Sequence, residues 1–292
     1  MAIIEIKHLP IGEGKAKAKQ IKHLYIPSFK PVLDGRWRAL QTKDYNPDPD
    51  MEWLVKEILR IAPELSDITT QRAIYYMLRG QFPNKVFRGN PLGSDKFYTQ
   101  LTSSGMEKVQ LAAGVTMQSL GIWAAPRGYI AGDGVIRSPR RGRIPLTAQP
   151  TLQFDLVDTG ASLDSNAHKV IHFEKDAGFA NLVSGDMPRF LEAIFSTSQG
   201  QLSETANKFL RQAEDWGLKC YCVHDADTFG CMMQLLYGLA SKNNCYMPSE
   251  FYPKSVKSLG FFPSIANKLN LPPEQIDEKE RILFSNLQEM SK

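Results

Sequence analysis

The chain has 292 residues, of which 42% are hydrophobic and 23% charged, a composition ordinary for a globular protein. This length suits about two domains and excludes a small disulfide scaffold, collagen and long disorder. No apolar stretch reaches the roughly 18 residues of a membrane-spanning helix, and the opening MAIIEIKHLP lacks the pattern of a secretory signal peptide.

The net charge is only +4, but positive charge is concentrated in two blocks. Residues 1–43 hold nine Lys or Arg and three acids, and residues 137–143 (RSPRRGR) hold four Arg and no acid. The rest of the chain is therefore acidic overall. Such blocks bind a polyanion such as nucleic acid, or they are a solvated tail and a flexible arginine loop.

The cysteines form no C-x-x-C pair. Cys220 and Cys222 alternate in KCYCVH, which predicts one face of a buried strand, while Cys231 and Cys245 stand alone. We therefore expect reduced core thiols rather than zinc ligands.

Short helices are predicted after a basic, proline-dotted N-terminal extension, residues 1–49, which we expect to be irregular. The PDPD sequence that ends at Asp50 is a helix start signal and precedes apolar residues with a 3.6-residue period. Thr69 or Thr70 is expected to cap a second helix, TTQRAIYYML. A third helix follows Ser94, and a fourth begins near Met106.

The segment LGIWAAPRGYIAGDG, residues 120–134, predicts two short strands around a Pro-Arg-Gly turn. Helices followed by a hairpin are the order of a winged helix, a helix-turn-helix variant that commonly binds DNA. We expect residues 50–145 to form this winged-helix domain. Residues 146–166 are expected to be a linker that includes the strand-like run LQFDLV.

The second half alternates strand and helix. Strands are predicted at 169–174, 191–198 and 219–224, with helices after Ser203 and at 229–241. This order predicts a mostly parallel sheet with right-handed crossovers, so the fold class is mixed α/β with two domains. The second domain is expected to span the rest of the chain, from residue 167 to residue 292.

Three carboxylates follow strands of this predicted sheet. Glu174 ends the first strand, and Asp225 and Asp227 follow the third, so we expect all three at one sheet edge. Carboxylates that close repel one another unless a cation is present, and Mg²⁺ suits such oxygen ligands. The alternative is that they are ordinary turn acids. His172 and His224 lie on strand patterns and are expected to be packed histidines rather than ligands.

Three segments, HFEKDAGF, STSQG and VHDADTFG, occur in the order of a Toprim domain. They resemble the version found in type IIB topoisomerase A-like proteins, the family of the DNA topoisomerase VI A subunit. The meiotic double-strand-break transesterase belongs to the same family, which has E-K, T-G-K-G and D-A-D-P-Y-G at these places. Gln199 stands where its lysine is usual, and Thr228 and Phe229 replace Pro-Tyr, while the carboxylates are intact.

The same family carries a nucleophilic tyrosine in a segment like T-x-R-x-x-Y-Y, which here runs from Thr70 to Tyr76. The resemblance implies that Tyr76 is the nucleophile. Arg72 lies one helical turn earlier, where it could hold the phosphate and favour the phenolate. Tyr75 is expected to be core packing, and Arg72 has the alternative of a surface ion pair.

The resemblance also implies DNA contacts. MQSLGIWAAPRGYIAGDG resembles a family stretch with Arg127 at a basic position, and Lys175 follows the first carboxylate. Arg127 is a DNA contact or a solvated turn residue, and Lys175 a phosphate contact or a surface lysine. The block at 137–143 has no family counterpart that aligns, so it binds DNA backbone or is a flexible loop. Its arginines are Arg137, Arg140, Arg141 and Arg143.

The implied function is Mg²⁺-dependent cleavage of both strands of DNA by tyrosine transesterification, which leaves 5′-phosphotyrosyl ends. In the family two A subunits form a homodimer, and the tyrosine of one works with the metal of the other. The chain has no P-loop motif, so strand passage would need a separate GHKL-type ATPase B subunit. Its short length resembles the stand-alone mini-A type, expected in the cytoplasm or nucleoid of a prokaryote, or in a eukaryotic nucleus, and not at a membrane.

Two other functions stay open. A DNA-binding protein that does not cleave would use the basic blocks and carry a degenerate Toprim domain, which the departures at Gln199 and Thr228 would favour. A Toprim nuclease would hydrolyse DNA through a metal-activated water.

Overall fold

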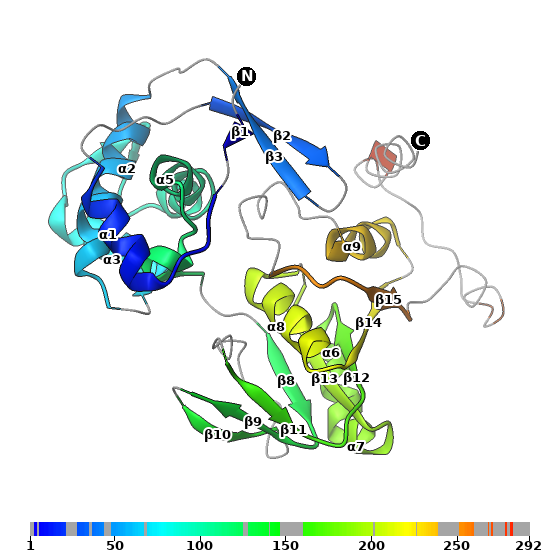
Figure 1. Ribbon diagram of the computed structural model, residues 1–292. Helices are drawn as coiled ribbons and strands as arrows, with labels where there is room; N and C mark the ends of the chain where they lie inside the picture. The colour runs from blue at the N-terminus through cyan, green and yellow to red at the C-terminus, as the bar shows by residue number, and fades with distance from the viewer. Residues whose placement is uncertain are drawn as a thin grey trace. The chain divides into compact units, whose positions relative to one another are not determined.

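The chain divides into two compact units: a first unit of residues 1–125 and 240–249, and a second unit of residues 126–239 and 250–292 (Figure 1). Helices and strands alternate in the second unit, so the predicted mixed α/β class is confirmed. This computed structural model describes residues 3–4, 6–21, 28–34, 37–43, 48–66, 69–124, 128–139, 141–146, 160–200, 202–225, 227–238, 251–259, 268, 270, 278 and 281–282.

The first unit is mainly helical. Its helices are α1 (Ile11–Lys19), α2 (Pro49–Ile61), α3 (Gln71–Gln81), α4 (Asp95–Gln100) and α5 (Met106–Ala113), with 3-10 turns at Ala62–Glu64 and Gln118–Leu120 and a π-helical turn at Leu101–Gly105. Its strands are β1 (Ile3–Ile4), β2 (Ser28–Asp34), β3 (Trp37–Lys43), β4 (Thr69–Thr70), β5 (Val86–Phe87), β6 (Asn90–Pro91) and β7 (Ile122–Trp123).

Side-chain hydrogen bonds cap the N-termini of three predicted helices, α2, α3 and α4. The Asp48 carboxylate accepts from the N–H groups at the start of α2, and Thr70 Oγ1 accepts from Ala73 N at 3.1 Å at the start of α3. Ser94 Oγ accepts from Phe97 N at 3.2 Å and starts α4. These bonds satisfy N–H groups that have no partner inside the helix, which confirms the predicted starts.

The predicted irregularity of residues 1–49 is wrong. Helix α1 packs against the turn Gln118–Leu120, and Gly14 approaches Ser119 so closely that a side chain at position 14 would not fit. Leu9 N donates to Ser119 Oγ at 2.8 Å beside this contact. The sequence of α1, IGEGKAKAK, has glycines and lysines in place of an apolar stripe, so periodicity gave no sign of the helix.

The predicted wing hairpin is also wrong. Strand β7 pairs in parallel with β4, with Thr69 opposite Ile122. Strand β8 (Tyr129–Gly132) pairs antiparallel with a strand of the second unit. An isolated two-stranded hairpin is only marginally stable, whereas β8 as part of a larger sheet buries Ile130 and Ala131 on opposite faces. The winged-helix assignment of residues 50–145 therefore stays a prediction.

The second unit is built on a five-stranded sheet in the order β15-β14-β12-β13-β8. Strands β13, β12, β14 and β15 are parallel, and β8 is the antiparallel edge strand. The mostly parallel sheet is therefore confirmed. The elements after β8 are β9 (Val135–Ser138), β10 (Gly142–Pro145), β11 (Ser162–Asp164), β12 (Lys169–Phe173), α6 (Asp176–Ser184), α7 (Met187–Phe190), β13 (Ala193–Thr197), α8 (Glu204–Asp215), β14 (Lys219–Val223), α9 (Thr228–Gly238) and β15 (Val256–Ser258).

The central strand β12 is buried on both faces. Val170 packs in a core with residues of α8 and α9, and Ile171 packs with Phe179 of α6 on the opposite face. This explains why the strand reads as an unbroken apolar run. Helices α6 and α7 lie on one side of the sheet and α8 and α9 on the other (Figure 1).

Cys220 and Cys222 lie on β14 and are buried free thiols, as predicted. Burial raises the pKa of each to about 12, so both stay protonated at neutral pH. Cys245 lies outside the described residues, as does the side chain of Cys231.

The arginine block at 137–143 and the predicted linker at 146–166 both contribute strands to a small sheet. Strands β9 and β10 form an antiparallel hairpin, and β11 pairs with the other side of β9. The run LQFDLV lies outside the described residues. The compact units also divide the chain differently from the predicted domains, since residues 1–49 fall in the first unit and residues 126–145 in the second. Within the described part of the chain, no helix is long and apolar enough to cross a membrane.

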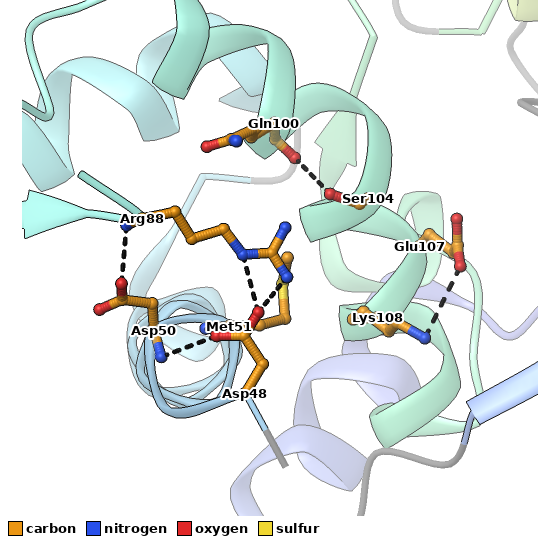
Figure 2. Close-up of polar contacts among 8 residues, drawn as sticks. All are labelled: Asp48, Asp50, Met51, Arg88, Gln100, Ser104, Glu107 and Lys108. Carbon is orange, nitrogen blue, oxygen red and sulfur yellow. Dashed lines mark hydrogen bonds and ion pairs between the residues drawn. The ribbon is translucent and has the colours of Figure 1, made fainter. Parts of the chain in front are cut away.

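Two aspartates at the start of α2 hold the β5–β6 hairpin (Figure 2). Arg88 has a φ of +48°, in the left-handed region, and its guanidinium binds the Asp48 carboxylate, with Nε 2.7 Å from Oδ2. Its backbone N–H donates to Asp50 Oδ2 at 2.7 Å. Left-handed backbone is unfavourable for a residue with a side chain, so these bonds offset its cost. They also join α2 to the hairpin that follows α3.

We expect Asp48→Ala to lower the free energy of unfolding by about 1 to 2 kcal/mol, because it removes the helix cap and the Arg88 pair together. Burial acts to raise the pKa of Asp48, but the bonds from Arg88 and the helix N–H groups outweigh it and hold the pKa below the ordinary value. The stabilisation is therefore present above about pH 4 and is lost as the solution becomes more acidic. Urea unfolding at pH 7 and pH 3 measures both effects, and an equal difference at the two pH values would contradict the pH dependence.

Candidate active site

The three predicted carboxylates follow two neighbouring strands at their carboxyl ends. Glu174 follows β12, and Asp225 and Asp227 follow β14, which pairs with β12 in parallel. Glu174 N donates to Val223 O at 3.0 Å, so the pairing of the strands continues up to the first carboxylate. The sheet therefore places the acids at the edge where ligands bind in open α/β folds.

Glu174 carries the clearest electrostatic strain of this edge. Its pKa is raised above the ordinary value by burial, and the charges of Asp225 and Asp227 act in the same direction. A backbone hydrogen bond from Asp225 and the charge of Lys175 act against them. One carboxylate oxygen, Oε2, is buried and accepts no hydrogen bond from any residue that the structure describes. An unpartnered buried carboxylate oxygen is costly, so this atom calls for a cation or a proton.

The two aspartates each have a partner. Asp225 forms an ion pair with Lys175, whose side chain is 63% exposed. Asp227 Oδ1 accepts from Gly230 N at 2.6 Å and thereby caps α9. Across the described residues, no three His, Cys, Asp or Glu side chains already converge as a metal cage. The acids are gathered at one edge, and a metal would have to draw Asp225 away from Lys175.

The chemistry of this donor set fits Mg²⁺. The edge offers carboxylate oxygens, which a hard cation prefers, and Mg²⁺ in proteins is commonly held by one or two carboxylates and several waters. Oε2 of Glu174 supplies an oxygen to which none of the described residues donates a hydrogen bond. Glu174 and Asp225 are the residues best suited to hold the ion, and Asp227 already serves the helix.

Gly230 shapes the loop between β14 and α9, a role that the sequence patterns did not reveal. A side chain at this position would collide with the backbone carbonyl of Asp225 and with His224. The loop can therefore fold tightly against α9 only if residue 230 is a glycine. The signal was present in VHDADTFG as a glycine three residues after Asp227, the same glycine that ends the family's D-A-D-P-Y-G motif.

The two histidines near the acids are packed, as predicted. His172 is fully buried, and its ring nitrogens lie 2.9 Å from Ser196 Oγ and 3.2 Å from Ser198 Oγ. Burial lowers its pKa to about 3, so the ring is neutral. His224 Nε2 lies 2.9 Å from Ser258 Oγ on β15. Both nitrogens of each ring have partners, which leaves none for a metal.

Gln199 takes the place of the family lysine and lies in a left-handed turn with φ +58°. Its amide Nε2 is 3.5 Å from Asp176 Oδ2, a weak contact at the start of α6. The backbone is held by a hydrogen bond from Gln199 N to Thr197 Oγ1 at 3.2 Å. The loop therefore keeps a defined geometry, but the residue brings no positive charge to it.

In the first unit, α3 carries the predicted tyrosine. Tyr76 is 52% exposed, and Arg72 Nε donates to its hydroxyl at 3.4 Å from one turn earlier on the same face. The bond to Tyr76 also raises the pKa of Arg72. Tyr75 is buried and packs edge-on against Tyr98, as expected of a core residue. The two neighbouring tyrosines therefore have different environments, since Tyr76 is exposed and Tyr75 is buried.

Tyr98 on α4 is a neighbour of this pair that the sequence did not indicate. The Arg72 guanidinium carbon lies 5.7 Å from the centre of the Tyr98 ring, within the range of a cation–π contact. Arg72 is thus held by a ring on one helix and a hydroxyl on another turn of its own helix. Nothing in the spacing of α3 and α4 along the chain shows which side chains meet across them, so no local pattern could reveal the contact.

The predicted DNA contacts are only partly described. Arg127 and Arg140 lie outside the described residues. Lys175 is paired with Asp225, which keeps it at the edge that holds the carboxylates. The other predicted contacts belong to the β9–β10 hairpin: Arg137, Arg141 and Arg143.

Comparison with known families gives one match, over residues 169–291, to the Toprim domain of the topoisomerase 6 A subunit/Spo11 family. This segment begins with β12 and includes all three carboxylates of the sheet edge. The family match therefore covers the described candidate metal site and does not extend to the tyrosine in the first unit.

Individual relatives match more of the chain. The DNA topoisomerase 6 A3 subunit of Oryza sativa subsp. indica is 25% identical over 288 residues, which are 90% of this chain and 64% of the relative. The DNA topoisomerase 6 A subunit of Arabidopsis thaliana is 24% identical over 62% of this chain and 45% of its own length. The type 2 DNA topoisomerase 6 A subunit of the Sulfurisphaera tokodaii strain is 26% identical, over 65% and 50%. The chain thus spans between 45% and 64% of the length of these relatives.

We expect Mg²⁺ to raise the thermal unfolding temperature of the protein, because it would neutralise Glu174 and Asp225 in the folded state alone. A dissociation constant near 1 mM would give about 1.4 kcal/mol at about 10 mM Mg²⁺. Glu174→Gln should abolish this increment. Asp186→Asn, which removes an exposed carboxylate elsewhere in the second unit, is the matched control and should keep it. Equal increments in Glu174→Gln and the wild type would contradict a metal site at this edge.

Proposed function

We propose that this chain, whose residues 169–291 match the Toprim domain of the topoisomerase 6 A subunit/Spo11 family, cleaves both strands of duplex DNA by tyrosine transesterification. The observation that carries the chemistry is the exposed residue Tyr76, whose hydroxyl accepts a hydrogen bond from Arg72 on one face of α3. The relatives are named as topoisomerase 6 A subunits, which supports DNA as the substrate. Action on chromosomal DNA would place the chain in a nucleoid or a nucleus.

Tyr76 is the proposed nucleophile. Its phenolic oxygen attacks a backbone phosphorus, a new P–O bond to the tyrosine forms, and the P–O3′ bond breaks. The phenolic proton passes to water, and the 3′ oxygen leaves and takes up a proton as a free hydroxyl. The product is a 5′-phosphotyrosyl end, and attack by the 3′ hydroxyl reverses the reaction and reseals the strand.

Arg72 is proposed to bind the scissile phosphate. Its guanidinium offers several donors in a fixed planar arrangement, which suits the oxygens of a phosphate in the transition state. The Tyr98 ring behind it limits the positions that the side chain can take. Arg72 would therefore stabilise the charge that develops on the phosphate beside the attacking oxygen.

Glu174 and Asp225 are the proposed Mg²⁺ ligands, with Asp227 as the third member of the edge. When bound, Mg²⁺ supplies charge neutralisation at the phosphate. Lys175, released from Asp225, would keep a positive charge at the same edge and contact the DNA, and Arg127 is a further proposed contact. Gln199 cannot replace the charge of the family lysine.

The proposed assembly is a homodimer in which the tyrosine of one protomer works with the carboxylates of the other, and each cuts one strand. Strand passage would then require a separate ATPase B subunit of the GHKL type. The resemblance to the family is the basis for proposing both the second A subunit and the B subunit.

A non-cleaving DNA-binding protein is the second candidate. The observation that favours it is Gln199, which replaces a phosphate-binding charge with a neutral amide that turns toward Asp176. A Toprim nuclease with a metal-activated water is the third reading of the same carboxylates. The three differ in what remains attached to the cut DNA.

We expect the protein with supercoiled plasmid and Mg²⁺, denatured with detergent, to yield DNA with protein covalently bound to its 5′ ends. Tyr76→Phe should abolish the adduct. Tyr75→Phe is the matched control, since it removes a hydroxyl from the adjacent ring, and it should keep the adduct. Free 5′ phosphates that persist in Tyr76→Phe would favour the nuclease. A plasmid that is retarded and uncut would favour simple binding.

Arg72→Lys should slow adduct formation on the order of 10²-fold while DNA affinity changes little, because lysine keeps the charge and loses the planar donors. Arg79→Lys makes the same exchange at another exposed position of α3 and should leave the rate unchanged. Single-turnover cleavage at saturating protein separates the two effects. Equal rates for the two variants would contradict a role of Arg72 in cleavage.

A further inference from the structure

The small sheet β10-β9-β11 of the second unit has two unlike faces. Ile136 on its central strand is buried, and its cross-strand neighbours Ile144 and Leu163 pack against the same core. Successive side chains on a strand point to opposite faces, so Arg137 and Arg143 lie on the other face. Both are exposed.

The two arginines on this face are direct neighbours across the hairpin. Arg143 and Arg137 are Cα partners in the β10–β9 register. Like charges directly opposite each other destabilise a strand pair, and their Cβ atoms lie only about 5 Å apart. Folding stability alone therefore does not explain why two arginines occupy this pair of positions.

Only one of the two has a carboxylate partner within the described part of the chain. Arg137 Nη2 lies 2.7 Å from Asp164 Oδ2 on β11, and no described carboxylate forms an ion pair with Arg143. The side chains of the pair are 51% and 61% exposed, so water screens the attraction and the pair is weak. A phosphate could therefore replace Asp164 at little cost.

Described residues on both sides of the hairpin turn hold the two strands in place. Arg141 N donates to Ser138 Oγ at 3.0 Å. Gly142 has a φ of +71°, which a glycine adopts without strain, and the strands pair again from this residue. The arginines are thus held on a hydrogen-bonded ribbon and not on an irregular loop.

We propose that the face of Arg137 and Arg143 binds the phosphate backbone of duplex DNA, and that Arg137 exchanges Asp164 for a phosphate on binding. The inference rests on the proposed function only in taking DNA as the partner, and it involves neither Tyr76 nor a metal. Arginine binds phosphate through paired donors, and Arg137 and Arg143 lie opposite each other on the exposed face of this sheet. Each contact formed would release a condensed counterion.

Edge protection is the competing role for Arg143, because among the described strands β10 lies at the edge of its sheet. A charge of either sign prevents another strand from adding to an edge. Arg143→Glu keeps this protection and reverses the charge that a phosphate would meet. The substitution therefore separates the two roles.

The test measures binding of a fluorescent duplex at several salt concentrations, in the full chain with Tyr76→Phe and without Mg²⁺, so that no cleavage occurs. We expect Arg143→Gln to weaken binding uniformly across sequences and to reduce the slope of log K against log salt by about one. Arg143→Glu should weaken binding further. Asp164→Asn should tighten binding, a gain that misfolding cannot produce.

Lys219→Gln is the matched control. It removes one exposed positive charge of the second unit at the start of β14, and it should leave the salt slope unchanged. An Arg143→Glu protein that melts like the wild type and binds DNA with the wild-type affinity and slope would overturn the inference. So would an equal loss of slope in Lys219→Gln.

These outcomes are separable from those of the cleavage proposal. Loss of binding in Arg143→Glu, together with no tyrosine adduct in the wild type, would retain the hairpin inference and reject transesterification. Normal DNA affinity in Arg143→Glu, together with an adduct at Tyr76, would do the reverse.

Discussion

One sheet edge of the second unit is shaped by the repulsion among carboxylates gathered where parallel strands end. The register of β12 against β14 brings Glu174 up to the loop that holds Asp225, and burial makes the negative charge of Glu174 costly. Lys175 and the N–H groups at the start of α9 compensate part of this negative charge. One oxygen of Glu174 has no hydrogen-bond donor among the residues described. A sheet edge arranged in this way is stabilised by whatever brings positive charge to it.

Local features of this fold were predictable, and choices of partner were not. Caps such as Asp48, Thr70 and Ser203 act within one helical turn, so the sequence beside them is sufficient to place a helix start. Strand β8 was predicted to pair with the preceding strand β7, but it pairs with the distant strand β13, where the larger sheet buries it on both faces. Helix α1 was missed because close contact at Gly14, and not an apolar stripe, holds it in place.

The candidate site divides in the same way. The carboxylates could be placed from sequence, since parallel strands end at a common edge, and the family resemblance read from three short motifs is confirmed over residues 169–291. The Lys175–Asp225 pair, the contact of Arg72 with Tyr98 and the role of Gly230 all join segments whose approach no spacing encodes. The structure added most to the interpretation of the arginine block, which lies on a small sheet with one packed face and one exposed face.

The buried thiols on β14 can report on the opening of the central sheet. With a pKa of about 12, Cys220 and Cys222 are ionised at neutral pH only on the order of once in 10⁵ molecules, and almost no solvent reaches them in the folded chain. Alkylating reagents can therefore modify these two positions only when the central sheet opens. Strand β14 leads directly into Asp225. The rate of thiol modification therefore measures how often the strand that carries the acids opens, and a ligand that binds at this edge and stabilises the closed sheet would slow the modification.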